Sequence, residues 1–189
     1  MIRPNGRELG TKNWNSTAVI LETERLVLAP VSLADSPDVY PILGDPEVMA
    51  HWDIAEIEDP DLVDQMLTAQ ARAVSDETGY FWSIRRVSDS ELLGLCDLSD
   101  IDRRHHRAEV GFILGKRNWR QGYAHEAMQA VVNFASNQGI QRLWARTHIG
   151  NESSERLLVK LGFELEGYLR GHVDRDGERR DCRLWGLLL

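Results

Sequence analysis

The stretch that decides the fold is residues 109–124, which read EVGFILGKRNWRQGYA. Together with Ala108, its first residues alternate well enough to predict a strand over 108–114, and the residues from Gly122 onward begin a helical pattern. Three cations occupy the loop between the two: Lys116, Arg117 and Arg120. A helix N-terminus presents unpaired N–H groups and about half a positive charge, and glycine permits close backbone approach. The stretch therefore predicts a phosphate-binding site, although on these residues alone Gly122 could equally be an ordinary helix cap.

Elements of both types lie on either side of this stretch. Apolar periodicity and turn residues predict strands at 25–31, 80–87, 92–98, 141–148, 163–170 and 179–188, and helices at 33–43, 59–75, 123–138 and 151–161. The order is β-αα-βββ-α-β-α-ββ, with a polar hairpin turn at 174–178 between the last two strands. Three consecutive strands without intervening helices exclude a doubly wound sheet, so we expect a mixed α/β (α+β) fold.

A second informative segment is residues 151–163, NESSERLLVKLGF. Asn151 or Ser153 is expected to cap the helix, and the leucines are expected to enter the core. Gly162 follows the last helical turn, where a left-handed residue commonly ends a helix.

Composition limits the classes of function. The chain has 189 residues, enough for one domain, and a net charge of −8 argues against a DNA-binding protein. No apolar run approaches the roughly 20 residues that span a bilayer, and residues 1–20 lack the apolar core of a secretory signal, so we expect a flexible leader on a cytoplasmic protein with no membrane partner. The two cysteines make no disulfide framework, and the six histidines have no zinc-ligand spacing, so we predict no metal.

Taken together, the two segments resemble the GNAT acetyltransferases. The family's pyrophosphate motif, Gln/Arg-x-x-Gly-x-Gly/Ala, matches 119–124 except that Trp119 stands at its first position. A later motif, Asn-x-x-Ala/Ser-x-x-Leu-Tyr-x-Lys-x-Gly-Phe, matches at Asn151, Ser154, Leu157, Lys160, Gly162 and Phe163. TERLVLA at 23–29 and AEVGF at 108–112 resemble the RimJ/RimL branch, which acetylates protein N-termini. The resemblance covers 21–189 and implies a single GNAT domain, a mostly antiparallel sheet with flanking helices.

The resemblance also implies acetyl-CoA as the acetyl donor. The strand before the phosphate loop would pair with the pantetheine arm, N–H groups of 121–125 would bind the pyrophosphate, and Asn151 would hold the cofactor or the substrate amide. The implied cofactor-binding residues are Phe112, Ile113, Leu114, Arg117, Arg120, Gln121, Gly122, Tyr123, Ala124, His125 and Asn151.

The implied chemistry is direct attack of a neutral amine on the thioester. Glu109 is the candidate general base, through a water, or else an ordinary salt-bridged strand residue; Asp181 is a weaker candidate. Many relatives place a tyrosine acid where this chain has Leu158, so Ser154, a water or Tyr168 would protonate the leaving thiolate.

The implied acceptor is a primary amine, with a protein N-terminal α-amine favoured because its reference pKa is around 8 while that of lysine is around 10.4. The alternatives are a small amine or an antibiotic, or a CoA-binding regulatory module without catalysis. Residues 45–64 carry eight acidic side chains and no Lys or Arg. They would steer a cationic acceptor or simply form a solvated acidic surface. Both a monomer and a homodimer fit the sequence.

Overall fold

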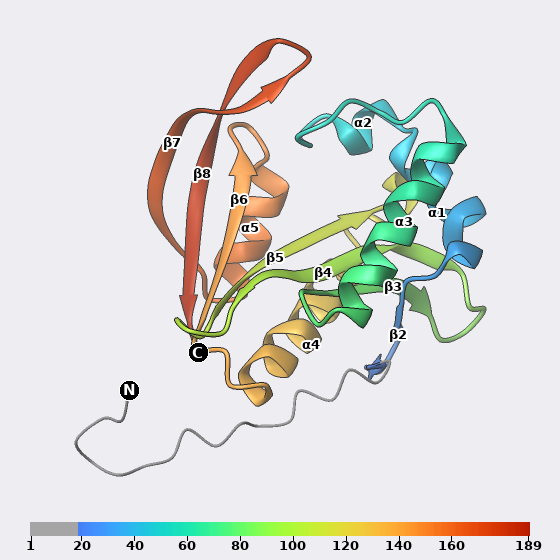
Figure 1. The fold of residues 1–189 in the computed structure, drawn as a ribbon, viewed down its shortest axis with the longest axis horizontal. Helices are drawn as coiled ribbons and strands as arrows, with labels where there is room; N and C mark the ends of the chain where they lie inside the picture. Colours follow the sequence, from blue (N-terminus) through green and yellow to red (C-terminus); the bar gives the residue numbers. More distant parts are fainter. Residues whose placement is uncertain (1–18) are drawn as a thin grey trace.

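The structure is a computed structural model that describes residues 19–189 (Figure 1). The predicted leader at 1–20 therefore lies outside the described residues, apart from its last two positions. At one of these, the Val19 carbonyl accepts a hydrogen bond of 2.8 Å from the indole N–H of Trp82.

A single sheet of eight strands runs through the described chain. The strands are β1 (Leu21–Glu22), β2 (Leu26–Pro30), β3 (Tyr80–Arg86), β4 (Leu92–Asp102), β5 (Arg107–Leu114), β6 (Arg142–His148), β7 (Glu164–Arg175) and β8 (Glu178–Leu188). Their order across the sheet is β1-β2-β3-β4-β5-β6-β8-β7, and of these neighbouring pairs only β5 and β6 are parallel. The expected mixed α/β fold with a mostly antiparallel sheet is confirmed.

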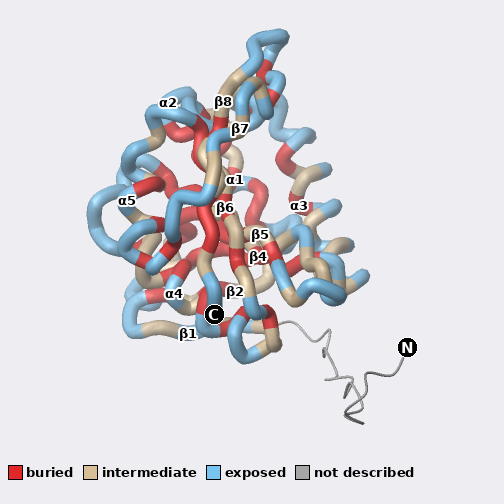
Figure 2. The backbone as a smooth tube through the Cα atoms, turned by 90° about the vertical axis from the view of Figure 1, so that its left-hand side faces the viewer, coloured by how far each residue is buried: buried red, intermediate tan, exposed pale blue. Residues whose placement is uncertain are grey.

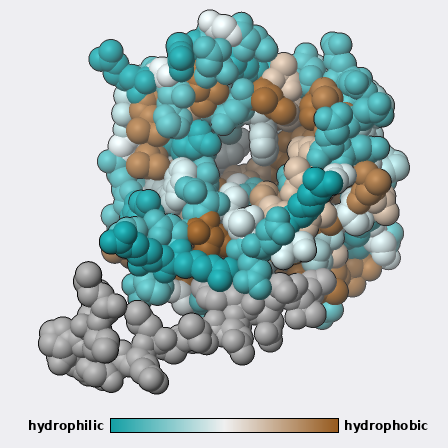
Figure 3. All heavy atoms as spheres, in the orientation of Figure 1, coloured by the Kyte–Doolittle hydropathy of each residue, from teal (hydrophilic) through white to brown (hydrophobic). Residues whose placement is uncertain are grey.

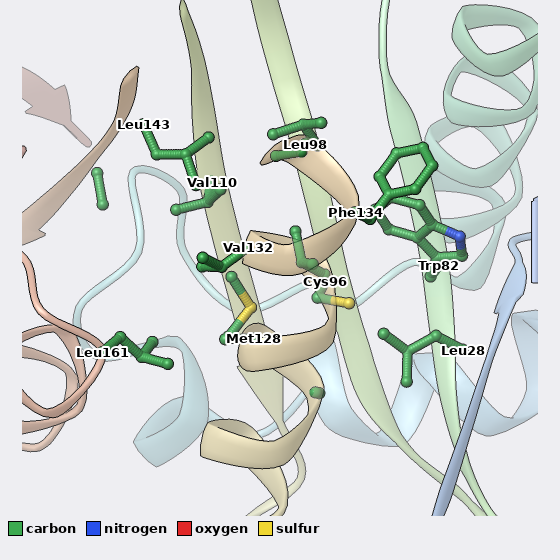
Figure 4. Close-up of a cluster of buried hydrophobic side chains, with 14 of the residues drawn as sticks. Leu28, Trp82, Cys96, Leu98, Val110, Met128, Val132, Phe134, Leu143 and Leu161 are labelled. Carbon is green, nitrogen blue, oxygen red and sulfur yellow. The ribbon is translucent and has the colours of Figure 1, made fainter. Parts of the chain in front are cut away.

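Helices cover both faces of the sheet. One face carries α1 (Ser36–Leu43), α2 (Pro46–Met49) and α3 (Pro60–Ser75), and the other carries α4 (Tyr123–Asn137) and α5 (Glu152–Lys160). Each face has its own apolar core. Met128 and Val132 of α4 pack with Cys96, Leu98 and Val110 of the sheet (Figure 4). A second, smaller core lies under α1 and α3, so the buried residues concentrate in the central strands between the two helical layers (Figure 2).

The predicted helix at 33–43 is divided in the structure. Leu33–Asp35 form a 3-10 turn, and α1 begins at Ser36 with Pro37 in its first turn and Pro41 inside it. Proline removes a backbone donor and fits best at the start of a helix, so the two prolines keep α1 short. The four-residue α2 was not predicted, because so short a helix has no periodicity to detect.

The last hairpin is longer than the sequence pattern indicates. The predicted turn at 174–178 shrinks to Asp176 and Gly177, both with positive φ, and β7 reaches Arg175. Two left-handed residues in a two-residue loop match the twist of a hairpin. Gly171, also at positive φ, lies where the register of β7 and β8 shifts. No helix in residues 19–189 is long and apolar enough to cross a bilayer.

The feature that positions the site is the divergence of β5 and β6. Their parallel ladder contains only three residue pairs, from Arg107↔Arg142 to Glu109↔Trp144. Beyond this point β5 continues beside β4 while β6 continues beside β8, and the two strands separate (Figure 1). The sheet therefore opens between two adjacent strands in its middle.

Candidate active site

A cleft of about 790 Å³ occupies the opening between β5 and β6. Its walls include the free part of β5, the end of β6, the N-terminal turns of α4 and α5, and residues just after α2. The molecular surface is hollowed at this place (Figure 3). The cleft therefore joins the two segments that the sequence singled out.

The first turn of α4 opens onto this cleft. Gly122 is the N-terminal capping residue with φ of +83°, and within the described chain no side chain caps the turn. Gly122, Tyr123, Ala124 and His125 all line the cleft. Free N–H groups, a left-handed glycine and the positive end of a helix dipole together suit a phosphate. Gly122 therefore has both of its predicted properties, a helix cap and an open backbone.

Arg25 of the β1–β2 turn holds this helix start in place. Its guanidinium donates to the Gln121 carbonyl at 3.1 Å, pairs with Glu126 at 2.6 Å and lies 4.7 Å from the ring centre of Tyr123. The sequence pattern did not single out Arg25, since nothing near residue 25 indicates contact with residues 121–126.

The predicted cations of the loop before α4, residues 115–122, point in different directions. Arg120 lines the cleft, but the side chains of Arg117 and Gln121 do not. Arg117 pairs with Glu91 at 2.9 Å. The Gln121 side-chain amide donates to the Arg117 carbonyl at 2.8 Å. Trp119, the residue that departs from the family motif, donates its indole N–H to the Leu114 carbonyl at 2.8 Å. The indole thus ties the loop to the end of β5.

The free edge of β5 offers backbone groups to the cleft. Gly115 donates its N–H to Leu93 of β4 at 2.9 Å, and donors alternate along a strand. The backbone of Ile113 therefore faces β4, whereas Phe112 and Leu114 direct theirs toward the side vacated by β6. Of the three predicted pantetheine-pairing residues, these two have the suitable orientation.

The start of α5 forms the opposite wall. Asn151 caps the helix by accepting the Ser154 N–H at 3.2 Å, and both residues line the cleft. Leu158 is buried and lines the cleft; it stands at the tyrosine position of the family motif. The expected cap is confirmed, and Ser154 lies one helical turn before Leu158.

A polar network lies on the face of the sheet that α1–α3 cover. Arg146 of β6 contacts Glu109 at 3.2 Å and Asp53 at 3.4 Å, and Asp53 accepts a 2.8 Å bond with His148 Nε2. Burial raises the pKa of Glu109, and the positive charge of Arg146 opposes that rise. Glu109 is thus a salt-bridged strand residue that also lines the cleft, and its role as general base stays a prediction.

Two further side chains on this face were missed by the sequence interpretation. Asp97 of β4 lines the cleft beside Ser99, whose hydroxyl donates to it at 2.7 Å. Burial raises the pKa of Asp97 to about 6, with a further contribution from the Glu109 charge. The only available signal was a lone aspartate in an apolar strand, LLGLCDL.

The two alternative proton carriers lie elsewhere. Tyr168 donates its hydroxyl to Asp181, which also accepts the Gly171 N–H at 2.6 Å, and neither side chain lines the cleft. Most of the acidic segment 45–64 is engaged in capping or ion pairs; of its acidic residues, Glu47 and Asp53 reach the cleft.

The sequence of the chain is similar to those of known acetyltransferases. Residues 25–164 match the model of the acetyltransferase (GNAT) domain. The uncharacterized N-acetyltransferase YoaA of Bacillus subtilis is 30% identical over 170 residues, 89% of this chain and 96% of its own. The [ribosomal protein uS5]-alanine N-acetyltransferase of Escherichia coli is 29% identical over 112 residues, 58% of each chain.

Solved structures share the fold. RimL, a ribosomal L7/L12 α-N-protein acetyltransferase, superposes with a TM-score of 0.83 at 15% identity, covering 91% of this chain and 95% of its own. The microcin C7 self-immunity acetyltransferase MccE, solved with acetyl-CoA and AMP, gives 0.79 at 16% identity, covering 88% and 94%. The chain belongs to the GNAT acetyltransferase family and is an N-acetyltransferase, with ribosomal-protein acetyltransferases of the RimJ/RimL type among its relatives.

Proposed function

We propose that this enzyme transfers the acetyl group of acetyl-CoA to the α-amine of a protein N-terminus by direct attack in a ternary complex. The observation that carries this proposal is the cleft itself. It runs from the open N-terminus of α4, which suits phosphates, through the separated strands to a carboxylate-bearing face. Donor and acceptor can thus enter from different sides of the sheet.

The donor side fits the chemistry of acetyl-CoA. N–H groups of residues 122–125 would hold the pyrophosphate, helped by Arg120. The backbone of Phe112 and the N–H of Leu114 would pair with the amides of the pantetheine arm, since the Leu114 carbonyl already accepts the Trp119 indole N–H. An N–H there would stabilise the oxyanion as the thioester is attacked. Gly122 supports this assignment because the space beside its backbone is open: among the described residues, only Arg25 Nη2, at 3.4 Å, lies within 4 Å of an added Cβ.

Proton transfer would use groups on both walls. A carboxylate on the α1–α3 face takes the proton that the attacking amine must lose, and Glu109 is the candidate that the sequence provides. The Ser154 hydroxyl on α5 is the candidate donor to the leaving thiolate. No covalent intermediate on the protein is needed, because the amine attacks the thioester directly.

The preference for an N-terminal α-amine rests on chemistry and on relatives. An α-amine with a pKa around 8 is about a tenth neutral at pH 7, so modest base assistance is sufficient. The named relatives that act on ribosomal proteins support the same class. Glu47 and Asp53 line the cleft, but Glu47 is paired with Lys116, and Asp53 with Arg146 and His148. These two carboxylates therefore do not favour an N-terminal amine over a polyamine or an aminoglycoside.

The test is release of the free CoA thiol from acetyl-CoA with a panel of acceptors. The panel contains a peptide that begins with alanine, the same peptide blocked by N-terminal acetylation, a polyamine and an aminoglycoside. We expect release with the free peptide and not with the blocked one, and mass spectrometry should locate the new acetyl group on the α-amine. Release with the polyamine or aminoglycoside alone would overturn the N-terminal substrate, and acetyl-CoA binding without release for any acceptor would favour the non-catalytic module.

A further inference from the structure

Asp97 occupies a special place on the sheet. Its register partner on β5 is Gly111, one residue before Phe112, whose backbone faces the cleft. On its other side Asp97 pairs with Phe81 of β3. The carboxylate therefore projects from the strand next to the proposed thioester position, on the face where the acceptor would enter.

The backbone leaves room for this carboxylate. A Cβ placed on Gly111 would lie 2.5 Å from Asp97 Oδ1, closer than real contacts allow. A glycine at position 111 therefore lets the oxygen lie over the β5 backbone. Oδ2 accepts the Ser99 hydroxyl at 2.7 Å, whereas Oδ1 accepts no hydrogen bond from the described residues.

The charge on Asp97 has no counter-ion in the part of the chain that the structure describes. Glu109, its neighbour on the same face, has Arg146 at 3.2 Å, but no Lys, Arg or His of residues 19–189 forms an ion pair with Asp97. A partly buried carboxylate without a cation is costly, so a cation supplied by a ligand would relieve that cost.

Asp97 also stands between two spaces. It lines the main cleft, and it lines a second cavity of about 70 Å³ between α3 and the sheet. The second cavity is mostly apolar, with Gln70 of α3 as its other polar side chain, and the Oε1 atom of Gln70 is buried without a hydrogen-bond partner. A ligand cation at Asp97 would thus sit at the mouth of a small, largely apolar recess.

We propose that Asp97 is the carboxylate that binds the ammonium group of the acceptor and takes its first proton, a catalytic role that rests on the acetyl transfer proposed above. The ammonium gives one proton to Asp97 Oδ1 and becomes a neutral amine. Its nitrogen then forms a bond to the thioester carbonyl carbon and the carbon–sulfur bond breaks. The Ser154 hydroxyl gives its proton to the thiolate and is reprotonated by the second proton leaving nitrogen. The products are the amide, the CoA thiol and a protonated Asp97, which releases its proton to solvent.

Charged groups around Asp97 determine the pH range in which its carboxylate is ionised and can accept a proton. Glu109 on β5 is the nearest negative group on its face and raises the pKa of Asp97. Arg146 on β6 is bound to Glu109 and Asp53, and His51 and His148 lie farther along the cleft wall. The cavity side of Asp97 meets neutral side chains of α3 and β3. Since the pKa of Asp97 is about 6, the group is ionised at neutral pH and still basic enough to accept a proton.

The test compares the parent enzyme with Asp97→Asn and Gly111→Ala, using the alanine-starting peptide as acceptor. Asp97→Asn keeps the shape of the side chain and removes its charge. Gly111→Ala keeps the carboxylates of Asp97 and Glu109, but its added Cβ displaces Asp97 Oδ1. We expect kcat/KM to fall about 100-fold in each variant. We also expect the decline of parental kcat/KM below about pH 6 to disappear in Asp97→Asn. Asp76→Asn, an exposed aspartate at the end of α3, is the matched control and should behave as the parent.

Acetyl-CoA affinity, measured by calorimetry, should be kept in Asp97→Asn, which shows that the variant is folded. An active Asp97→Asn with a parental pH profile would overturn the role of Asp97 while leaving the proposed function intact. No acetyl transfer by the parent to the peptide or to any amine of the panel would overturn both.

Discussion

At the scale of single residues, two carboxylates on the same face of the sheet have different surroundings. Glu109 is held by Arg146, which opposes the effect of burial on its pKa, whereas Asp97 has, among residues 19–189, only a neutral hydroxyl donor in Ser99. The difference comes from β6, because Arg146 projects toward Glu109 from a strand that has already separated from β5. One carboxylate is thereby neutralised within the protein, and the other remains available to a ligand.

The first prediction concerns stability. The pKa of Asp97 is raised to about 6, so the folded state must ionise a partly buried group as the pH increases. The stability that the neutral group contributes below about pH 4 is therefore lost as the pH rises through 6. Asp97→Asn should therefore raise the free energy of unfolding at pH 8 by about 1–3 kcal/mol, with no gain at pH 4. Urea denaturation at both pH values checks this. A variant that is less stable than the parent at pH 8 would indicate a structural role.

The second prediction separates the two carboxylates. Glu109→Gln removes a negative charge that raises the pKa of Asp97, so the acidic limb of the kcat/KM profile should move to lower pH and remain present. Steady-state rates between pH 5 and 9 with the alanine-starting peptide measure the shift. If the limb vanishes in Glu109→Gln and persists in Asp97→Asn, Glu109 is the base.

Single residues were the hardest feature to obtain from the sequence. The motif placed Gly122, Asn151 and Ser154 in the cleft, because their backbone roles are local to one helix start. Asp97, Asp53 and Arg146 come from three distant segments and line one cleft only because of strand register and the α2–α3 connection. No local sequence pattern indicates that these three segments come together.

At the scale of elements, the loop between β5 and α4 connects both halves of the proposed donor site. Trp119 bonds the Leu114 carbonyl, and Asn118 is buried with its amide 3.4 Å from the Leu93 carbonyl. The loop is thus fixed to the sheet at one end, while Arg25 fixes the helix start at the other. The first N–H groups of α4 are therefore held at a set position relative to the free edge of β5.

The third prediction tests that connection. Trp119→Phe keeps an aromatic ring but removes the 2.8 Å bond to Leu114, so the loop should loosen. Losing one hydrogen bond is worth about 1 kcal/mol, and we expect KM for acetyl-CoA to rise about 5-fold with kcat nearly unchanged. Saturation kinetics in acetyl-CoA at a fixed peptide concentration measure this. A fall in kcat with constant KM would show that Trp119 acts on the chemical step instead.

Elements were predictable where their pattern is long. α3 begins at Pro60 and ends at Ser75, as capping by Asp59 and the helical period indicate. β4 and β7 extend four and five residues beyond the predicted ends at 98 and 170, because cross-strand pairing continues into polar sequence that carries no strand signal. The four-residue α2 was not predicted, and α1 was predicted with its first three residues in error, because short or proline-interrupted elements depend on tertiary packing.

At the scale of the whole molecule, one topological event produces the site. Two parallel strands pair over three residues and then part, so the sheet bends open while both of its faces stay covered by helices. The order of elements was predictable from alternating periods, but the place where β5 and β6 separate was not, since neither strand sequence changes character there. Only the family resemblance pointed to a cofactor between them.

The fourth prediction concerns the central claim, that phosphates of acetyl-CoA bind the start of α4. Gly122→Asp places a negative charge and a side chain at that site, and Gly139→Asp is the matched control at the other end of the same helix. Both glycines have nearly the same φ, +83° and +84°, so the backbone strain of the two substitutions is alike.

The decisive measurement is the dissociation constant of acetyl-CoA, by calorimetry, for the parent and these two variants at equal ionic strength. The account predicts at least a roughly 10-fold weaker affinity for Gly122→Asp, because an added anion opposes phosphate binding, and parental affinity for Gly139→Asp. Unchanged affinity in Gly122→Asp, or equal losses in both variants, would contradict a donor site at the N-terminus of α4.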